Sequence, residues 1–148
     1  MKRAIATFGT AAAAAVLTLG LATPSSAATL QSKALTYAKV QLGEPYVYGA
    51  EGPNAWDCSG LTWAAYKASG HPITRTAQTQ FNHVQHIFYS QIKPGDLVFF
   101  GGVHSISHVG IYAGGGKIVN ANTGAYRGRK VVTAPISEYS GQRHYGRV

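Results

Sequence analysis

The order of apolar and polar residues changes from a helical period in the first half of the chain to short apolar runs in the second half. Over residues 30–42 apolar side chains recur every three or four positions and Gly43 follows, which predicts a helix that ends there. Residues 61–70 predict a second helix that also closes on a glycine, and residues 76–84 a shorter one. Residues 45–49 are expected to be extended, because a residue before a proline avoids helix.

The second half of the chain predicts strands. In the run at residues 107–113, Val109 and Ile111 share one face of the predicted strand, and His108 and Tyr112 share the opposite face. Three glycines at 114–116 lack the lysine and the helix of a phosphate-binding loop, so they predict a hairpin turn. Helices followed by antiparallel strands predict an α+β domain, with the N-terminal helices packed on one face of a small sheet. The strands are expected at residues 97–100, 107–113, 117–122, 131–134 and 143–148.

Residues 1–28 have the pattern of a secretory signal peptide. A basic start, an apolar stretch at residues 4–22 and a final group of small residues follow one another. We expect cleavage after Ala27 or Ala28, one domain at residues 29–148, and a secreted protein in the cell wall or outside the cell. An uncleaved membrane anchor is the alternative, but the Ala and Gly content of the stretch disfavours it, so no stable membrane anchor is expected.

The composition shows a net positive charge, which does not by itself identify a binding partner. Of the 13 Lys and Arg residues, 11 remain once Lys2 and Arg3 are set aside, against five Asp and Glu, which leaves a net charge of +6. Such a chain is attracted to polyanions, of which a cell envelope and nucleic acid are the candidates. The basic residues are scattered except at 127–130, so we expect no nucleic-acid partner. We also expect a monomer.

Cys58 is the only cysteine, so it cannot form an internal disulfide. In an exported chain an unpaired cysteine is either an intermolecular bridge or a reactive thiol. Cys58 follows a turn-forming run at residues 52–57 and opens the second predicted helix. There the positive end of the helix dipole favours a thiolate, so we expect the pKa of the thiol to be lowered. A small buried cysteine that only packs is the alternative.

A nucleophilic thiol needs a base and a third group that orients the base. His108 is the best candidate for the base, and it points away from the face of Val109. If the helix that starts at Cys58 packs on the His108 face, thiol and imidazole can meet. Asn120 and Asn122 lie two residues apart on the next strand, and either side-chain oxygen can accept the imidazole N–H. This is the Cys-His-Asn arrangement of papain-like enzymes.

A metal site is the weaker reading of the other histidines. His83 and His86 are three residues apart and can share a face. A zinc site needs three or four ligands, and no further cysteine or closely spaced carboxylate joins these two. We therefore expect neither a metal nor another cofactor.

Three blocks of the sequence resemble the signature of the NlpC-type peptidases (the NlpC and p-sixty family). They are Asp-Cys-Ser-Gly-Leu at 57–61, Lys-Pro-Gly-Asp-Leu-Val-Phe-Phe at 93–100 and His-Val-Gly-Ile-Tyr at 108–112. Residues 43–49 and the pair Arg75-Thr76 followed by Gln80 add weaker similarity. The blocks stand in the family's order and the resemblance covers nearly all of residues 30–148.

The resemblance implies a papain-like NlpC-type fold and a cysteine endopeptidase that cuts peptidoglycan stem peptides, typically between γ-D-glutamyl and the diamino acid. It implies Cys58 as the nucleophile and His108 as the base. The family's third position falls on Asn120, where many members have histidine. Asparagine can orient an imidazole but offers no charge, and Asn122 stays a second candidate for this role.

The same resemblance implies further site residues around the nucleophile. Tyr46 is expected to help stabilise the oxyanion, together with a main-chain N–H at the start of the helix. Asp57 and Ser59 flank Cys58 and are candidates for binding the free amine of a stem peptide. Asp57 is equally a candidate for a helix N-cap.

Two other functions fit the same residues. The same fold can catalyse amide hydrolysis or acyl transfer on another amide, as in a toxin that acts on the cell walls of competitors. A non-catalytic wall-binding module is the second alternative, and the presence of both Cys58 and His108 argues against it.

Overall fold

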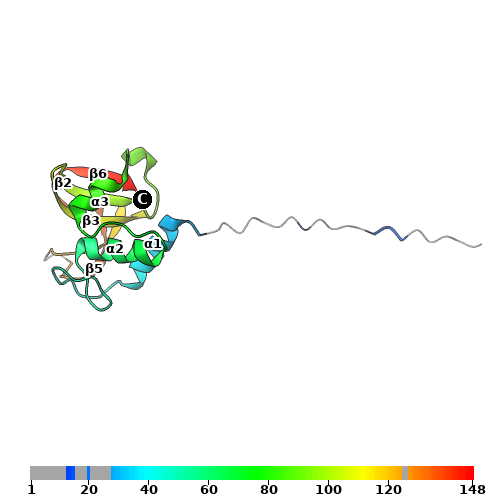
Figure 1. Cartoon of the computed structure of the whole chain (residues 1–148), viewed down its shortest axis with the longest axis horizontal. Helices are drawn as coiled ribbons and strands as arrows, with labels where there is room; N and C mark the ends of the chain where they lie inside the picture. Colours follow the sequence, from blue (N-terminus) through cyan, green and yellow to red (C-terminus); the bar gives the residue numbers. More distant parts are fainter. Residues whose placement is uncertain (1–12, 16–19, 21–27, 125–126) are drawn as a thin grey trace, which may run out of the picture.

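The computed structural model describes residues 13–15, 20, 28–124 and 127–148 of the 148-residue chain. Most of the predicted signal peptide lies outside the described residues. Within them, no helix has the length and apolar character needed to cross a membrane. All the helices and strands of the described chain come after residue 28 (Figure 1).

The two longer helices form where the sequence predicts them and pack side by side (Figure 1). α1 spans Leu30–Val40, two residues shorter than predicted, and α2 spans Cys58–Ala68. Thr29 and Asp57 precede them as N-caps, and each side chain accepts a main-chain N–H of the first turn. The capping reading of Asp57 is therefore confirmed, and Cys58 is the first residue of its helix.

In the described part of the chain, six strands form one antiparallel sheet in the order β1-β6-β2-β3-β4-β5. The five predicted strands are present, and their ends differ from the prediction by at most two residues. The α+β fold with a small antiparallel sheet is confirmed. The bounds are β2 Leu97–Gly102, β3 Ser105–Gly114, β4 Lys117–Ala121, β5 Val131–Pro135 and β6 Arg143–Arg147.

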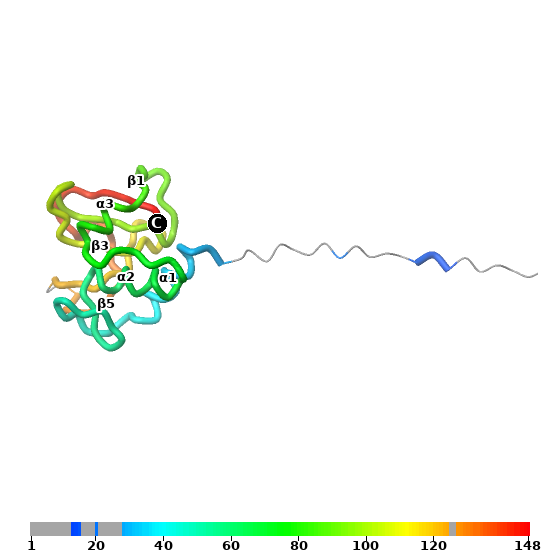
Figure 2. Tube along the Cα trace, viewed as in Figure 1, coloured from blue at the N-terminus to red at the C-terminus, as the bar shows by residue number. Residues whose placement is uncertain are grey.

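The two faces of the sheet are covered differently. The helices cover one face and bury the larger apolar cluster, to which the sheet contributes Leu97, Phe99, Val109, Ile111 and Val119. The opposite face carries a smaller cluster of Val98, Phe100, Tyr112, Ile118 and Ile136. This alternation agrees with the period of two in the strands. The C-terminal residue lies beside α1, where the Gln31 side chain donates to the Val148 carbonyl at 3.0 Å (Figure 2).

Several short elements escaped the sequence pattern. β1 is only Gln85–Ile87 and pairs with β6 at the edge, and the turns η1 and η2 span Tyr89–Gln91 and Ile136–Glu138. α3, Ala77–His83, is two residues shorter than predicted. Segments of three residues are too short to show a period, so tertiary pairing alone defines them.

The first of the five predicted strands was expected to end at Phe100, just before the glycine pair 101–102. Instead β2 continues through both glycines, and the register against β3 shifts between Phe100 and Gly101. Gly101 has φ +119°, and a Cβ there would lie 2.4 Å from the Ser105 carbonyl oxygen. A bulge with a glycine therefore lets the hairpin continue where a larger residue would end it.

Substituting Tyr66→Phe tests how α2 is tied to the sheet. Tyr66 is fully buried and its hydroxyl donates to the Gly95 carbonyl in the turn before β2. Loss of that donor leaves a buried carbonyl unpaired, so we expect the free energy of unfolding to fall by about 1–2 kcal/mol in urea titrations. Tyr48→Phe is the control, because Tyr48 is 86% exposed. Equal effects of the two substitutions would contradict this account.

Candidate functional site

The Cys58 thiol lies half-buried in the wall of a surface cleft at the start of α2. The cleft has a volume of about 390 Å³. Three sequence-predicted site residues, Tyr46, Asp57 and Ser59, line it with Cys58. Its other lining residues are Tyr48, Gly49, Arg75, Thr76, Ala77 and Ser107.

The Asp-Cys-Ser-Gly block has a local structural cause. Asp57 caps α2 through Oδ1, which accepts the Gly60 N–H at 2.6 Å. A Cβ on Gly60 would lie 2.2 Å from the Ala50 carbonyl oxygen and 2.8 Å from Asp57 Oδ1. Only glycine lets the preceding loop approach the first turn this closely, so the block holds Cys58 at the helix end that faces the cleft.

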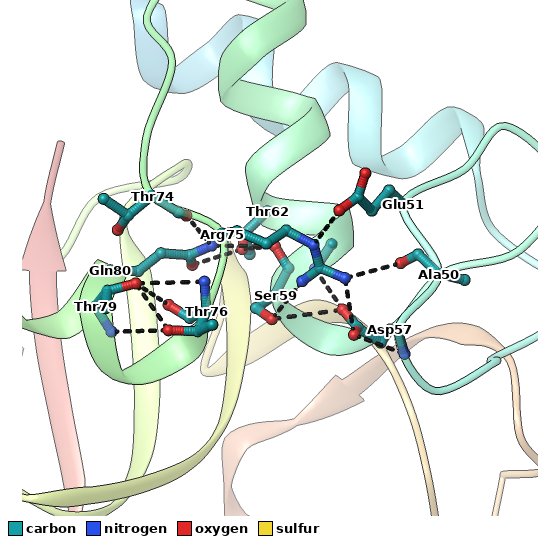
Figure 3. Close-up of polar contacts among 12 residues, drawn as sticks. Ala50, Glu51, Asp57, Ser59, Thr62, Thr74, Arg75, Thr76, Thr79 and Gln80 are labelled. Carbon is teal, nitrogen blue, oxygen red and sulfur yellow. Dashed lines mark hydrogen bonds and ion pairs between the residues drawn. The ribbon is translucent and has the colours of Figure 1, made fainter.

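Arg75 joins the preceding loop to the start of α2 and was not among the predicted site residues. Its guanidinium donates to Glu51 Oε1 at 2.8 Å, to Asp57 Oδ2 at 2.9 Å and to Ser59 Oγ at 2.9 Å (Figure 3). Ser59 also donates to Asp57 Oδ1 at 3.4 Å. The weak similarity of Arg75-Thr76 to a fourth family block was the one signal in the sequence that pointed to it.

Gln80, the last residue of the same weak family block, has a structural role. Its buried amide nitrogen donates to the carbonyls of Ser59 and Thr74 at 3.0 and 2.9 Å, and its oxygen accepts from Thr62 at 2.7 Å (Figure 3). These bonds join α3 to the first turn of α2. The segment that carries Arg75 is thereby fixed against the helix of Cys58.

His108 and Asn120 are paired in the buried part of the sheet. The two atoms His108 Nε2 and Asn120 Oδ1 lie 2.8 Å apart. An amide oxygen only accepts, so Nε2 carries the hydrogen and Nδ1 keeps its lone pair. Asn122, the second candidate, binds the following turn, with Nδ2 donating to the carbonyls of Gly124 and Gly128, and its Oδ1 accepts from the Tyr139 hydroxyl at 3.4 Å.

Two aromatic rings contact the imidazole of His108. Tyr139 stacks on it with centroids 5.1 Å apart and an interplanar angle of 13°, and Phe100 lies at 5.8 Å and 40°. The Tyr139 hydroxyl also donates to Asn120 Oδ1 at 2.8 Å. The sequence did not point to Tyr139, because a single tyrosine after a short turn forms no motif with residues thirty positions earlier.

The helix of Cys58 does not pack on the His108 face, so the condition stated for the meeting of thiol and imidazole is not met. α2 belongs to the cluster on the Val109 face, and the Cys58 side chain packs against the same cluster. The His108 ring contacts Phe100 and Tyr139 of the opposite cluster. The alternation of β3 was predicted correctly, but the helices pack on its Val109 face, where the larger apolar cluster is buried.

The sulfur nevertheless reaches the strand one residue from His108. The main-chain hydrogen bonds that act on the Cys58 thiol come from Val109 and Ser59. In the described chain, the ladder between β3 and β4 runs from Gly114–Lys117 to Ile111–Val119. His108 and Asn120 lie beyond the last of these pairs and are joined by their side chains. The thiol therefore approaches β3 where its pairing with β4 has ended.

The pKa of the Cys58 thiol is raised, which contradicts the expectation of a lowered value. Burial is the main cause and the Asp57 carboxylate adds to it, whereas main-chain hydrogen bonds at Val109 and Ser59 act in the opposite direction. Desolvation disfavours the thiolate more than the helix N-terminus favours it. The thiol therefore keeps its proton at neutral pH.

Burial also lowers the pKa of His108 below its usual value, although the hydrogen bond to Asn120 opposes the shift. The imidazole is therefore neutral at pH 7. The Cys58 thiol and the His108 imidazole therefore both rest in their neutral forms. This differs from a resting thiolate–imidazolium pair.

Tyr46 lies on the same cleft, with its ring under the Arg129 guanidinium at 5.5 Å. Burial raises the pKa of its hydroxyl, and the neighbouring Cys58 and Asp57 add to the shift. The hydroxyl therefore stays protonated and is available as a hydrogen-bond donor. This is the property that an oxyanion-stabilising group needs.

The sequence profile of the NlpC/P60 family matches residues 43–146. A probable endopeptidase of Corynebacterium glutamicum is 38% identical over 127 residues, which cover 86% of this chain and 56% of that protein. Matches to probable p60 endopeptidases of Listeria cover only 16–18% of those proteins. The chain therefore spans about half or less of the length of these relatives.

Solved structures show the same fold. The peptidoglycan hydrolase RipB of Mycobacterium tuberculosis is 27% identical with a TM-score of 0.69, and the match covers 80% of this chain and 64% of that one. RipD of the same organism, described as a non-catalytic NlpC/p60 domain protein adapted to peptidoglycan binding, has a TM-score of 0.69. The match covers 81% of this chain and 98% of RipD. At 22% identity the likeness to RipD shows the fold alone.

The raised pKa of Cys58 predicts how its reactivity depends on pH. The folded chain holds the thiol proton to a higher pH than the unfolded chain, so the rate of alkylation should keep rising above pH 9 without a plateau near neutrality. Iodoacetamide labelling followed by mass spectrometry measures this rate. The control is the same chain in urea, where the thiol titrates at its ordinary value. A plateau reached below pH 7 would contradict the assignment.

Replacing Arg75→Met should destabilise the fold and lower the reactivity of the Cys58 thiol. The Asp57 carboxylate, 8% exposed, would lose its cationic partner and stand uncompensated beside the thiol. We expect the free energy of unfolding to fall by about 2–3 kcal/mol, discounted for the partial exposure of the arginine. Thiol labelling at pH 8 should slow. Lys33→Met, on the exposed side of α1, is the control, and an Arg75 variant as stable as this control would contradict the account.

Proposed function

The chain belongs to the NlpC/P60 family, and we propose that it is a secreted cysteine endopeptidase that hydrolyses amide bonds in peptidoglycan stem peptides. The names of the relatives support the general activity, and the site supports the chemistry. The observation that carries the proposal is the hydrogen bond from His108 Nε2–H to Asn120 Oδ1. It leaves Nδ1 of a neutral imidazole as a base, one residue from the main chain that the Cys58 thiol contacts.

Cys58 and His108 act together through Nδ1. This is the ring nitrogen nearer to the histidine's own main chain, and the next main-chain N–H along β3 is that of Val109. In this proposal the Cys58 sulfur lies on the Nδ1 side of the imidazole, because the Val109 main chain acts on the thiol and Asn120 holds the other ring nitrogen. Asn120 holds the other nitrogen, which is the Cys-His-Asn division of roles of papain-like enzymes.

The reaction is acyl transfer in two steps. As the sulfur of Cys58 attacks the amide carbonyl, its proton passes to His108 Nδ1, and the oxygen becomes an oxyanion. The imidazolium then protonates the leaving amine, the C–N bond breaks and a thioester remains. Water attacks the thioester, giving a proton to the imidazole, and the released thiolate takes a proton back.

The oxyanion needs donors on the cleft side of Cys58. The main-chain N–H of Cys58 at the start of α2 and the hydroxyl of Tyr46 supply them in this proposal. Asn120 is neutral, so it orients the imidazole without an added negative charge to stabilise the imidazolium. We expect a slower first step than with a carboxylate in that position.

The substrate is the stem peptide cut between γ-D-glutamyl and the diamino acid. Asp57 and Ser59 line the cleft beside the nucleophile and are the proposed contacts for the free amine of the stem peptide. Arg75 holds both side chains in place. The net charge of +6 for the residues after the predicted signal peptide favours encounter with an anionic wall.

A non-catalytic wall-binding module is the second candidate. The observation that favours it is the burial of both reactive groups, which raises the thiol pKa and lowers the imidazole pKa. Amidase or acyl-transfer chemistry on another amide keeps the same residues and differs only in the substrate.

Digestion of purified muropeptides by the C-terminal domain, residues 29–148, tests the proposal, with products identified by mass spectrometry. We expect new termini at the γ-D-glutamyl–diamino acid bond, unaffected by EDTA, and none with Cys58→Ala. Asn120→Ala should lower kcat by about tenfold to a hundredfold, because the imidazole loses its orienting partner.

Thermal unfolding of each variant separates loss of chemistry from loss of fold. Products from Cys58→Ala equal to those of the unsubstituted chain, or loss of activity in EDTA, would contradict the thiol mechanism. Binding to purified sacculi without any cleavage would favour the wall-binding candidate. Products with a different new terminus would favour the other amide chemistries.

A further inference from the structure

We propose that Tyr139 is a positioning residue for His108, whose hydroxyl orients the Asn120 amide and whose ring holds the plane of the imidazole. The inference rests on the proposed function and adds a fourth member to the Cys58, His108 and Asn120 set. It comes from the C-terminal part of the chain, from the turn between β5 and β6.

The first support is the hydrogen bonding of Asn120. Its oxygen accepts from both His108 Nε2 and the Tyr139 hydroxyl, each at 2.8 Å. Its amide nitrogen, Nδ2, is buried and has no partner in the part of the chain that the structure describes. No acceptor on the nitrogen side therefore holds the amide group in its orientation, and the two donors to Oδ1 are what hold it.

Rotation of that amide would remove the base. With Nδ2 turned toward the imidazole, His108 Nε2 would have to accept a hydrogen bond, and the ring proton would move to Nδ1. The nitrogen proposed to take the Cys58 proton would then be blocked. After this rotation the Tyr139 hydroxyl would face the Asn120 amide nitrogen, and its oxygen would have to accept a hydrogen bond from it. A phenol oxygen serves poorly as an acceptor, because its lone pair is delocalised into the ring.

The second support is the ring of Tyr139. It stacks on His108 at 13° between planes, and Phe100 contacts the imidazole at 40°. Tyr139 and Phe100 also contact each other, with centroids 4.9 Å apart. The imidazole is thereby fixed in the plane that directs Nε2 toward Asn120. A stacked aromatic face also favours the imidazolium that forms during the reaction.

Tyr139 is itself held in place by its turn. Its N–H donates to the Ile136 carbonyl at 3.1 Å, and its own carbonyl accepts from Arg143 at 3.2 Å. The preceding Glu138 forms two hydrogen bonds with Arg127, at 2.8 and 2.6 Å. Burial raises the pKa of the Tyr139 hydroxyl, so it remains a donor throughout the neutral range.

The test compares Tyr139→Phe, which removes only the hydroxyl, with Tyr139→Leu, which also removes the stacked ring. Nitrogen-15 NMR of the histidine side chains reports which nitrogen of His108 carries the proton. We expect the Nε2–H form in the unsubstituted chain and a larger share of the Nδ1–H form in Tyr139→Phe. The kcat on muropeptides should fall by about threefold to tenfold with KM unchanged, and further in Tyr139→Leu.

Tyr145→Phe is the matched control, because Tyr145 packs against the same apolar cluster while its ring contacts Tyr89. It should change neither the tautomer of His108 nor kcat. If Tyr139→Phe keeps the Nε2–H form and the kcat of the control, the proposal is overturned. An effect of equal size in both variants would show a general loss of packing and would also overturn it.

The two proposals fail separately. The NMR measurement needs no substrate, so it decides the role of Tyr139 even if the chain cleaves no muropeptide. An altered tautomer without activity in any variant would retain Tyr139 as the residue that orients His108 and reject the endopeptidase. Activity that is lost in Cys58→Ala but unchanged in Tyr139→Phe would support the endopeptidase and reject the role of Tyr139.

Discussion

The arrangement of the site depends on the hydrogen bonds and the ion pair of the buried Asp57 carboxylate. One oxygen caps α2 by accepting the Gly60 N–H, and the other accepts the Gly49 N–H and binds Arg75. The helix start, the preceding loop and the segment before α3 are joined at this one group. A carboxylate that is 8% exposed is tolerated there because main-chain donors and a guanidinium compensate it. The position of the Cys58 sulfur follows from that cap.

Burial sets the chemistry of the pair as strongly as geometry does. It raises the pKa of Cys58 and lowers the pKa of His108, so both groups rest in their neutral forms. A neutral pair is protected from unproductive reactions of a free thiolate, but it requires proton transfer in the attacking step. In the proposed mechanism, the residues that orient the imidazole would therefore contribute more to catalysis than they would beside a preformed thiolate. In this chain those residues, Asn120 and Tyr139, are both uncharged.

Much of the fold could be predicted because local periodicity and burial agree. The helices of residues 30–42 and 61–70 repeat apolar residues at helical spacing, and β3 alternates Val109 and Ile111 with His108 and Tyr112. β1 and the two 3-10 turns could not be predicted, since they are too short for a period. The bulge after Phe100 also escaped, because glycines that usually end a strand here let one continue.

The sequence by itself determined the thiol at a helix start, the alternation of β3 and the family resemblance, because each is encoded within a few neighbouring residues. It left the Asp57 cap as one of two readings, which the structure confirmed. Only the tertiary structure decided which face of the sheet the helices cover and which asparagine binds His108. It also showed that Tyr139 contacts Asn120 and that Arg75 binds Asp57. It also reversed the expected direction of the Cys58 pKa. These outcomes depend on desolvation and on contacts between distant segments, which no local pattern records.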